Sequence, residues 1–540
     1  MAAGQESDLQ KQVEQATSII CVIGSSSADT QVDLIARHIR RLAKIVRVAH
    51  TCKSRTPPIA VAFAGSHGLP STMESNGIRL NQHPPAALWG ACRALRFEYP
   101  GVPITCMDVD THMNLNQVAN MMVHDLCSTH ALPEEMLYSR GTRYVKQMAM
   151  RPQWNITLNV NKEPNKLPKG SYIVTGGLGG LGLVTASVLA DMGATTLVLA
   201  SRSGHVRRAD QGLANKLENL RRQVEVQIVK CDVSSETDVL RLLQNLHKTS
   251  APIRGIVHTA GLLRDGLAAF QSEDHIKQVL SPKVAGTLHL HSHSILQPLH
   301  ISVMFSSIVS LFGNIGQTAY ATANAYMDAM ASARQYQGLP AMSIQWPAVS
   351  GVGMWESLSQ VEKTRTQAST VPVGHAVNVL HQVLHDLTLA VPFFVPRALL
   401  EAPGSVDAVE TGFEHIRARL QATTTKAKKQ ITERPQASRM HPTKKDLAAL
   451  TATVKVTVAQ AVTDIIGDEI SSDSPLMEAG VDSLASTELV NTLNDALGVA
   501  LGPTVLFDYP TIQDLTDHLV HSMAGDVTDG PQEIEQVPSE

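Results

Sequence analysis

The pattern of hydrophobic and polar positions divides the chain into four consecutive parts. The first part, residues 1–165, alternates short apolar runs with stretches of helical spacing. It predicts strands at 19–24, 45–49, 59–64 and 104–109 and helices at 30–41 and 85–99. Strands that alternate with helices are typical of a parallel sheet, so this part is expected to be an α/β subdomain.

The second part, residues 166–402, repeats this alternation. It predicts strands at 172–174, 195–200, 224–230, 253–258, 301–305, 342–346 and 392–395, and helices at 183–192, from 274 onward and at 318–335. The expected fold class is therefore α/β, with two Rossmann-like subdomains in succession. The first subdomain lacks, around Gly24, the glycine spacing that a pyrophosphate needs, so it is expected to pack without a cofactor.

The α/β pattern ends at residue 402, and residues 403–445 are expected to be a linker. The part at 423–445 is basic, carries Pro435 and Pro442, and has no interleaved aromatic residue. This composition favours a flexible, solvated tether over a nucleic-acid-binding patch.

Helical spacing returns in residues 446–525, at 446–466, 480–497 and 512–522, and predicts a small all-α unit. This unit contains twelve acidic residues and one lysine. A small acidic unit on a basic tether is typical of a mobile domain that docks on positive surfaces. The tail at 526–540 is expected to be disordered.

The overall composition is that of a globular, multidomain chain of 540 residues, with 43% hydrophobic residues and a net charge of −4. This length predicts three or four domains, and the small net charge excludes a global field that would attract nucleic acid or membrane. Six cysteines are scattered without paired spacing, which favours reduced thiols over a disulfide framework or a zinc site. No metal is therefore expected. No signal-peptide core or long apolar run is present either, so a cytoplasmic protein is expected.

A glycine-rich turn follows the first strand of the second subdomain. Gly177, Gly179 and Gly182 fit the pattern G-x-G-x-x-G, in which the backbone approaches a pyrophosphate at a helix N-terminus. Alone, the pattern is equally typical of a tight turn without a ligand. The next strand ends in Ser201 and Arg202, and an arginine there suits the 2′-phosphate of NADPH, where an acid would select NADH. A solvated arginine at a strand end is the alternative interpretation.

Two further strand ends carry candidate cofactor contacts. Asp232 follows the strand at 224–230 and is placed either to bind an adenine or to cap the next helix. The strand at 253–258 opens into a Thr-Ala-Gly segment. The expected cofactor-binding residues are Thr175, Gly177, Leu178, Gly179, Gly182, Ser201, Arg202, Asp232, Val233, Thr259, Ala260 and Gly261.

Four residues around the last predicted strands indicate the chemistry. Tyr320 and Asn324 lie at i and i+4 on one face of a helix, Ser307 ends the preceding strand, and Lys283 lies on the helix before it. Hydride transfer to a ketone develops an alkoxide, which needs a proton donor and a second hydrogen bond. A tyrosine can donate that proton if an ammonium stabilises its phenolate, while serine and asparagine fix the carbonyl or a relay water. Each residue alone is equally a structural residue, but the four together behind a dinucleotide turn indicate a reductase.

These motifs resemble those of a ketoreductase followed by an acyl carrier protein in a type I polyketide synthase. The resemblance covers essentially the whole chain and rests on the segments 88–100, 175–182, 283–287, 305–320, 481–484 (Val-Asp-Ser-Leu) and 506–510 (Leu-Phe-Asp-Tyr-Pro). The spacing also matches: Ser307 lies thirteen residues before Tyr320, Asn324 four after it, and Lys283 twenty-four before Ser307.

The resemblance implies a role for each of these residues. Tyr320 is the general acid, Ser307 hydrogen-bonds the substrate carbonyl, Lys283 supports Tyr320, and Asn324 completes the tetrad. Ser483 carries 4′-phosphopantetheine, although its position alone would indicate only a helix cap. The resemblance further implies a structural subdomain without cofactor at 1–165, a catalytic NADPH-binding subdomain at 166–402 and a four-helix carrier domain at 446–525.

Positions associated with the stereochemistry of the product also have counterparts. Leu263 and Asp265 resemble the signature of reductases that yield a D-configured 3-hydroxyl, and Phe312 stands where the opposite type tends to carry Trp. Arg264 departs from the commonest Leu-Asp-Asp form. The usual Trp-Gly-x-Trp pattern is altered to Trp-Pro-Ala-Val at 346–349, so the pocket under the nicotinamide is expected to differ in shape.

The expected function is NADPH-dependent reduction of a carrier-bound 3-oxoacyl thioester to the 3-hydroxyacyl thioester. The implied partners are an acyl thioester on the chain's own or a neighbouring carrier domain, a phosphopantetheinyl transferase, and ketosynthase, acyltransferase and other synthase domains, but neither nucleic acid nor membrane. A silent reductase beside a working carrier is the first alternative, against which the complete tetrad argues. A free-standing dehydrogenase of small alcohols is the second, against which the carrier unit and the duplicated first half argue.

Overall fold

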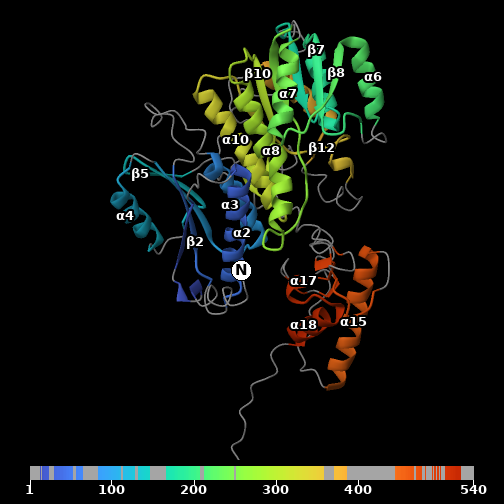
Figure 1. Ribbon diagram of the computed structural model, residues 1–540. Coiled ribbons are helices and arrows are strands. Elements are labelled where there is room, and N and C mark those ends of the chain that lie inside the picture. The colour runs from blue at the N-terminus through green and yellow to red at the C-terminus, as the bar shows by residue number, and fades with distance from the viewer. Residues whose placement is uncertain are drawn as a thin grey trace, which may run out of the picture. The chain divides into compact units, whose positions relative to one another are not determined.

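Figure 1 shows the computed structural model of the chain, which divides into two compact units, Met1–Thr424 and Thr425–Glu540. The structure describes residues 12–13, 15–16, 18–23, 30–52, 56–64, 83–110, 113–127, 132–145, 166–206, 212–248, 251–357, 370–385, 444–466, 470–476, 481, 489–490, 492–493, 496–497, 499, 501 and 505–524. The predicted strand at 392–395, most of the linker at 403–445 and the tail at 526–540 lie outside these residues. Within the described part, no helix is long and apolar enough to cross a bilayer.

The first sheet has five strands in the order β1-β2-β3-β4-β5. Their bounds are β1 (Ile19–Val22), β2 (Ile59–Ala64), β3 (Ile104–Val109), β4 (Glu135–Ser139) and β5 (Thr142–Val145). The first four strands pair in parallel, as predicted. β5 instead pairs antiparallel with β4 across a two-residue turn, in which Arg140 and Gly141 have positive φ angles of 50° and 75°. The sequence pattern did not predict this hairpin.

The helices of the first subdomain are α2 (Gln31–His50), α3 (His83–Glu98) and α4 (Leu115–Leu126). The strand predicted at 45–49 is wrong, because these residues form the last turns of α2. Ile39, Leu42 and Val46 continue one buried face at helical spacing. Burial of this continuous face outweighs the β-branched composition of the segment.

The second sheet has six parallel strands in the order β11-β10-β9-β6-β7-β8. Their bounds are β6 (Ser171–Thr175), β7 (Thr196–Ser201), β8 (Glu225–Lys230), β9 (Ile253–His258), β10 (Ile301–Ser307) and β11 (Met342–Trp346). Read from β8, this is the strand order 3-2-1-4-5-6 of the doubly wound dinucleotide fold. The neighbouring strands β6 and β9 mark the point where the order reverses, and such folds bind ligands there, at the carboxyl ends of the strands.

The helices of this subdomain are α5 (Gly180–Asp191), α6 (Leu213–Gln223), α7 (Glu236–His247), α8 (Glu273–Ser294), α9 (Val309–Phe312), α10 (Thr318–Tyr336) and α12 (Val373–His385). A small parallel pair, β12 (Ala348–Ser350) and β13 (Thr370–Pro372), follows β11. β12 contains part of the altered segment at 346–349. The sequence pattern predicted the six main strands but neither this pair nor α12.

The two subdomains share one hydrophobic core, because α3 packs directly against α10 (Figure 1). At Gly90 the backbones approach so closely that an added Cβ would lie 2.4 Å from the carbonyl oxygen of Ala321. Gly313, with a φ of 81°, approaches the carbonyl oxygen of Arg93 equally closely. The first subdomain therefore supports the helix that carries two of the expected catalytic residues.

The second unit is helical where it is described, with α15 (Lys444–Ile466), α17 (Val505–Asp508) and α18 (Ile512–Ala524). α15 and α18 pack together through a core that includes Val454, Val458, Leu515 and Leu519. This confirms the helices predicted at 446–466 and 512–522. The helix predicted at 480–497, including Ser483, lies mostly outside the described residues, and Ser483 itself is one of the residues left out.

Candidate active site

The glycine turn between β6 and α5 has a geometry that excludes side chains. Gly176 has a φ of 67°, a left-handed conformation that favours glycine. A Cβ added at Gly177 would lie 2.6 Å from the carbonyl oxygen of Val174. A Cβ added at Gly182 would lie 2.3 Å from the carbonyl oxygen of Gly176. The turn leads directly into the N-terminus of α5, whose N-cap is Gly179. Its bare backbone therefore fits the pyrophosphate of a dinucleotide.

Hydrogen bonds tie this turn to the end of β9. The backbone nitrogen and the hydroxyl of Thr259 both donate to the carbonyl oxygen of Thr175, at 3.1 and 2.7 Å. Two residues on, Gly261 leaves room for Lys283, since an added Cβ would lie 2.8 Å from the lysine Cε. At Gly176, an added Cβ would lie 2.9 Å from the backbone nitrogen of Ala260. The segment 259–261 thus joins the expected cofactor site to the expected catalytic site.

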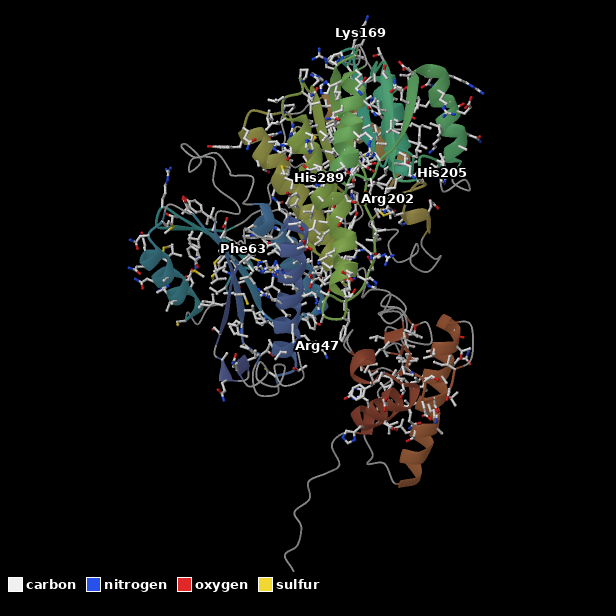
Figure 2. The ribbon with its side chains drawn as sticks, viewed as in Figure 1. Arg47, Phe63, Lys169, Arg202, His205 and His289 are labelled. Atoms are coloured by element: carbon white, nitrogen blue, oxygen red, sulfur yellow. The ribbon has the colours of Figure 1, made fainter. Side chains whose placement is uncertain are left out.

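The turn after β7 presents the expected phosphate-binding arginine. The hydroxyl of Ser201 accepts a hydrogen bond from the backbone nitrogen of Gly204 at 3.1 Å and closes the turn. Arg202 is exposed beside it, and Figure 2 labels it together with His205 of the same turn. An exposed guanidinium at the carboxyl end of this strand is placed to meet a phosphate on the ribose of a dinucleotide.

The remaining expected cofactor contacts are mostly backbone positions. Asp232 accepts hydrogen bonds from the backbone nitrogen and hydroxyl of Ser234, at 3.0 and 2.6 Å, and so closes the turn before α7. The helix cap itself is Ser235, not Asp232. Leu178 and Val233 are each 4% exposed, so their side chains pack in the core and only their backbone is available to a ligand.

Lys283 projects from α8 and is almost completely buried, at 3% exposure. Its Nζ donates a hydrogen bond to the carbonyl oxygen of Phe305 at 2.7 Å and lies 5.6 Å from the centre of the Tyr320 ring. Burial lowers the pKa of this lysine to about 7, and the nearby carboxylate of Asp328 opposes that shift.

Asp328 lies on α10 and anchors a buried polar cluster behind Lys283. One carboxylate oxygen accepts from the hydroxyl of Ser310 at 2.6 Å and from the amide of Gln345 at 2.7 Å. The other accepts from the hydroxyl of Ser343 at 2.7 Å. Burial raises the pKa of Asp328 and these hydrogen bonds lower it. The cluster places a buried acid within electrostatic reach of the active-site lysine.

Tyr320, Ser307 and Asn324 meet in front of Lys283. Burial raises the pKa of Tyr320 to about 12, and the negative charge of Asp265 acts in the same direction. Hydrogen bonding to Asn324 and Ser307 lowers this pKa. The phenol is therefore protonated at neutral pH and is a proton donor in contact with two further hydrogen-bonding side chains. The structure brings together all four residues that the sequence singled out.

Asn324 is held rigidly in this arrangement. Its Nδ2 donates to the carbonyl oxygen of Tyr320, one turn earlier, at 2.8 Å. Its Oδ1 is buried and accepts no hydrogen bond from the described residues. Ser307 is fixed by the backbone nitrogen of Val309, which donates to its hydroxyl at 3.3 Å.

The positions associated with stereochemistry lie on two different elements. Leu263 and Asp265 belong to the segment after β9, and Asp265 accepts a hydrogen bond from Nε2 of Gln317 at 2.9 Å. Phe312 ends the short helix α9 and is only 2% exposed, so its side chain belongs to the protein interior. A role for these three residues in stereocontrol remains a prediction.

Sequence reasoning assigned no role to Gln317, Glu98 and Asp328, which contact residues close to Tyr320 or act on Lys283. Gln317 lies three residues before Tyr320, so its helical spacing was a usable signal. Asp328 lies two turns after Tyr320 on the same helix. Glu98 lies far away in sequence, and its signals were its place in the family-like segment 88–100 and a lone acid at the end of an apolar helix.

Comparison with known proteins accounts for both units. The family model of the KR domain matches residues 170–351, and that of the phosphopantetheine attachment site matches residues 456–519. Polyketide synthase GfsA of Streptomyces halstedii is 35% identical over 368 residues, which are 66% of this chain and 5% of that protein. One component of the phenolphthiocerol/phthiocerol polyketide synthase of Mycobacterium tuberculosis is 27% identical over 528 residues, 94% of this chain and 27% of that protein. The chain thus spans only a small part of these relatives.

Among solved structures, an A1-type ketoreductase is similar, with a TM-score of 0.61 and 22% identity over 77% of this chain and 87% of that one. The strand order and the glycine turn define a Rossmann-like fold of the dinucleotide-binding kind, which this ketoreductase shares. With the KR and phosphopantetheine-attachment domains in succession, the chain is a ketoreductase–acyl carrier didomain of a type I polyketide synthase.

Proposed function

We propose that this chain reduces a carrier-bound 3-oxoacyl thioester to the 3-hydroxyacyl thioester with NADPH. The observation that carries this proposal is the meeting of Tyr320, Ser307 and Asn324 in front of the buried Lys283. The donors around the site are those that a developing alkoxide requires.

NADPH, when bound, supplies the hydride that is added to C3 of the acyl chain. The carbonyl oxygen, held by the hydroxyl of Ser307, takes the proton of the Tyr320 phenol as it becomes an alkoxide, so that the ketone gains two hydrogens in total. The ammonium form of Lys283 stabilises the phenolate that Tyr320 leaves behind. Asn324 orients the turn of α10 that carries Tyr320, because its Nδ2 donates a hydrogen bond to the carbonyl oxygen of Tyr320.

The choice of NADPH over NADH is supported by Arg202, whose exposed guanidinium can pair with a 2′-phosphate. The glycine turn at 176–182 would hold the pyrophosphate at the N-terminus of α5. Asp232 is proposed to contact the adenine and Thr259 to line the site. The six cysteines are free, which favours a reducing, cytoplasmic compartment for the reaction.

The carrier unit would deliver the substrate. We assign the 4′-phosphopantetheine arm to Ser483, which requires a phosphopantetheinyl transferase as a partner. The acyl chain would arrive on this carrier or on a neighbouring one, from the ketosynthase and acyltransferase domains of the synthase. The Leu263–Asp265 segment and Phe312 favour a D-configured 3-hydroxyl.

The decisive experiment compares NADPH oxidation by the native chain and by Tyr320→Phe, with a short 3-oxoacyl thioester as substrate. Because general acid catalysis contributes roughly a hundred-fold or more, the variant should lose most of its rate. Tyr336→Phe is the matched control, since Tyr336 lies at the exposed end of the same helix, and it should keep the native rate.

Other results would contradict the general-acid assignment or favour one of the alternative functions. If Tyr320→Phe keeps the native rate, the general-acid assignment is wrong. If the native chain consumes no NADPH while intact mass shows an arm on Ser483, the chain is a carrier beside a silent reductase. Turnover of free alcohols but not of thioesters would indicate a small-alcohol dehydrogenase. Chiral analysis of the product tests the D assignment, and replacement of NADPH by NADH tests the cofactor.

A further inference from the structure

Glu98 is a buried acid of the first subdomain that reaches into the second. It is the last residue of α3 and is only 1% exposed. One carboxylate oxygen accepts a hydrogen bond from the hydroxyl of Thr318 at 2.7 Å, and the other accepts from the backbone nitrogen of Ala268 at 3.0 Å. A buried carboxyl group is costly unless such donors satisfy it, so both partners are held close to it.

The hydrogen-bond partners of Glu98, which also include the backbone of Gly316, belong to the two segments that frame Tyr320. Thr318 is the first residue of α10 and lies two residues before Tyr320. Ala268 lies three residues after Asp265, in the segment that follows β9. A single side chain from the first subdomain therefore holds both segments.

The same two segments are also joined directly to each other. The backbone nitrogen of Gly266 donates to the carbonyl oxygen of Gly316 at 2.8 Å. The amide of Gln317 donates to the carboxylate of Asp265 at 2.9 Å. These bonds fix the register of the segments along each other, while Glu98 anchors the pair to the rigid α3. A shift of Glu98 would consequently move Asp265 and Tyr320 relative to one another.

We propose that Glu98 is a positioning residue, which sets the placement of the 263–268 segment against the start of α10 and thereby the carbonyl face that the site presents for reduction. This inference rests on the proposed reductase function. Glu98 itself touches neither the reacting atoms nor the expected cofactor site. The first subdomain thus contributes to the specificity of the reaction as well as to packing.

The test is Glu98→Gln in the full chain. Glutamine keeps the size of the side chain but replaces one carboxylate oxygen by an NH2 group, so the hydrogen bond from Ala268 or from Thr318 is lost, or the one to Thr318 reverses its direction. Because small misplacements near a reacting centre are costly, kcat/KM should fall roughly ten-fold or more, and the ratio of the two product enantiomers should move toward the minor one. Hydrogen exchange in peptides that cover 263–270 should become faster, and this readout does not depend on activity.

Thr318→Val provides a second, milder variant, which removes one donor and leaves the carboxylate in place. It should change the enantiomer ratio in the same direction. The double variant should be little worse than Glu98→Gln alone, because both changes break the same contact. Thr318→Val carries the test if Glu98→Gln does not fold.

Asp125→Asn is the matched control. Asp125 is a buried carboxylate of the same subdomain, on α4, that accepts from the hydroxyl of Tyr138 at 2.7 Å and from Arg143 at 3.0 Å. The same chemical change there should leave the enantiomer ratio and the exchange of 263–270 as in the native chain.

The outcomes separate the two proposals. If the native chain reduces the thioester, and Glu98→Gln and Thr318→Val keep its enantiomer ratio, kcat/KM and exchange rates, the positioning role is overturned and the reductase function stands. If the native chain does not reduce the thioester, the reductase function fails. In that case unchanged exchange in 263–270 overturns the anchoring by Glu98, and faster exchange supports the anchoring alone.

Discussion

The Nζ atom of Lys283 lies 5.6 Å from the centre of the Tyr320 ring and donates its hydrogen bond to the backbone of Phe305, not to the phenol. The structure shows no hydrogen bond between the two side chains, so the proposed effect of Lys283 on Tyr320 would be electrostatic. Because burial lowers the pKa of Lys283 to about 7, that charge is lost as the pH rises above neutrality. We therefore expect both the proposed reaction and the stability of the fold to depend on pH through Lys283.

The free energy of unfolding should depend on pH through the titration of Lys283. Its pKa is about 7 in the folded chain against 10.5 in the unfolded chain, so the unfolded state binds more protons between these values. Stability therefore rises with pH in this window because of Lys283. In Lys283→Met this contribution disappears, so the stability of the variant relative to the native chain should fall by up to about 1.4 kcal/mol per pH unit. Urea unfolding at pH 7, 8 and 9 measures this difference.

Lys248→Met, at the exposed C-terminus of α7, is the control and should show a difference from the native chain that does not vary over this range. A pH-independent difference for Lys283→Met as well would mean that the buried lysine does not titrate near neutrality.

Gly182→Ala should weaken cofactor binding. The new Cβ would lie 2.3 Å from the carbonyl oxygen of Gly176, so the glycine turn or the start of α5 must move. We expect the Kd for NADPH, measured by calorimetry, to rise at least roughly ten-fold, alongside a loss of about 1–3 kcal/mol in stability from overpacking. Gly374→Ala on α12, where an added Cβ meets nothing within 4 Å, should leave NADPH binding unchanged. Native affinity in Gly182→Ala would argue against this turn as the pyrophosphate site.

Arg202→Ala should weaken NADPH binding and leave NADH binding unchanged. A guanidinium that pairs with the 2′-phosphate contributes a charge-assisted hydrogen bond, so the Kd for NADPH should rise roughly ten-fold or more. Titration of both nucleotides, monitored by fluorescence, gives the two constants. Arg221→Ala, a change at an exposed arginine of α6, should alter neither of them. An equal loss of affinity for NADPH and NADH would show that Arg202 does not bind the 2′-phosphate.

Gly90→Ala, a change in the first subdomain, should impair the reaction catalysed in the second. The added Cβ would lie 2.4 Å from the carbonyl oxygen of Ala321, the residue after Tyr320, so α3 and α10 must separate. We expect kcat/KM to fall roughly ten-fold or more, since the proton donor moves with its helix. Gly101→Ala is the control in the same subdomain, because its Cβ would meet only the His50 ring at 3.8 Å. Native activity in Gly90→Ala would show that the close approach of these helices is not needed for catalysis.

Local features of the chain made much of this site predictable. The glycine turn lies within the connection from β6 to α5, and Ser307, Tyr320 and Asn324 lie within the connection from β10 to α10 and its first turns, so short stretches of sequence carry both. The apolar runs of the second sheet are likewise long enough to indicate strands buried on both faces. The strand prediction at 45–49 was wrong because a β-branched run can also continue the buried face of a helix. In α2 it does so.

The remaining features depend on contacts that no local pattern carries. Glu98 meets Ala268 across 170 residues of sequence and Thr318 across 220. The β4–β5 hairpin turns at Arg140 and Gly141, a pair without the usual asparagine or aspartate signal. Ser483 shows the converse case, because a short motif predicted its role while the structure does not describe it.

The close approach of α3 to α10 at Gly90 also limits how this didomain can be divided or recombined. A fragment that began at residue 166 would uncover the buried face of α10 and leave a large apolar surface in water. Exchange of reductases between synthases should therefore place the junction before the first subdomain and transfer both halves as one cassette. A graft of only the cofactor-binding half would set foreign side chains against a surface where even one methyl group has no room.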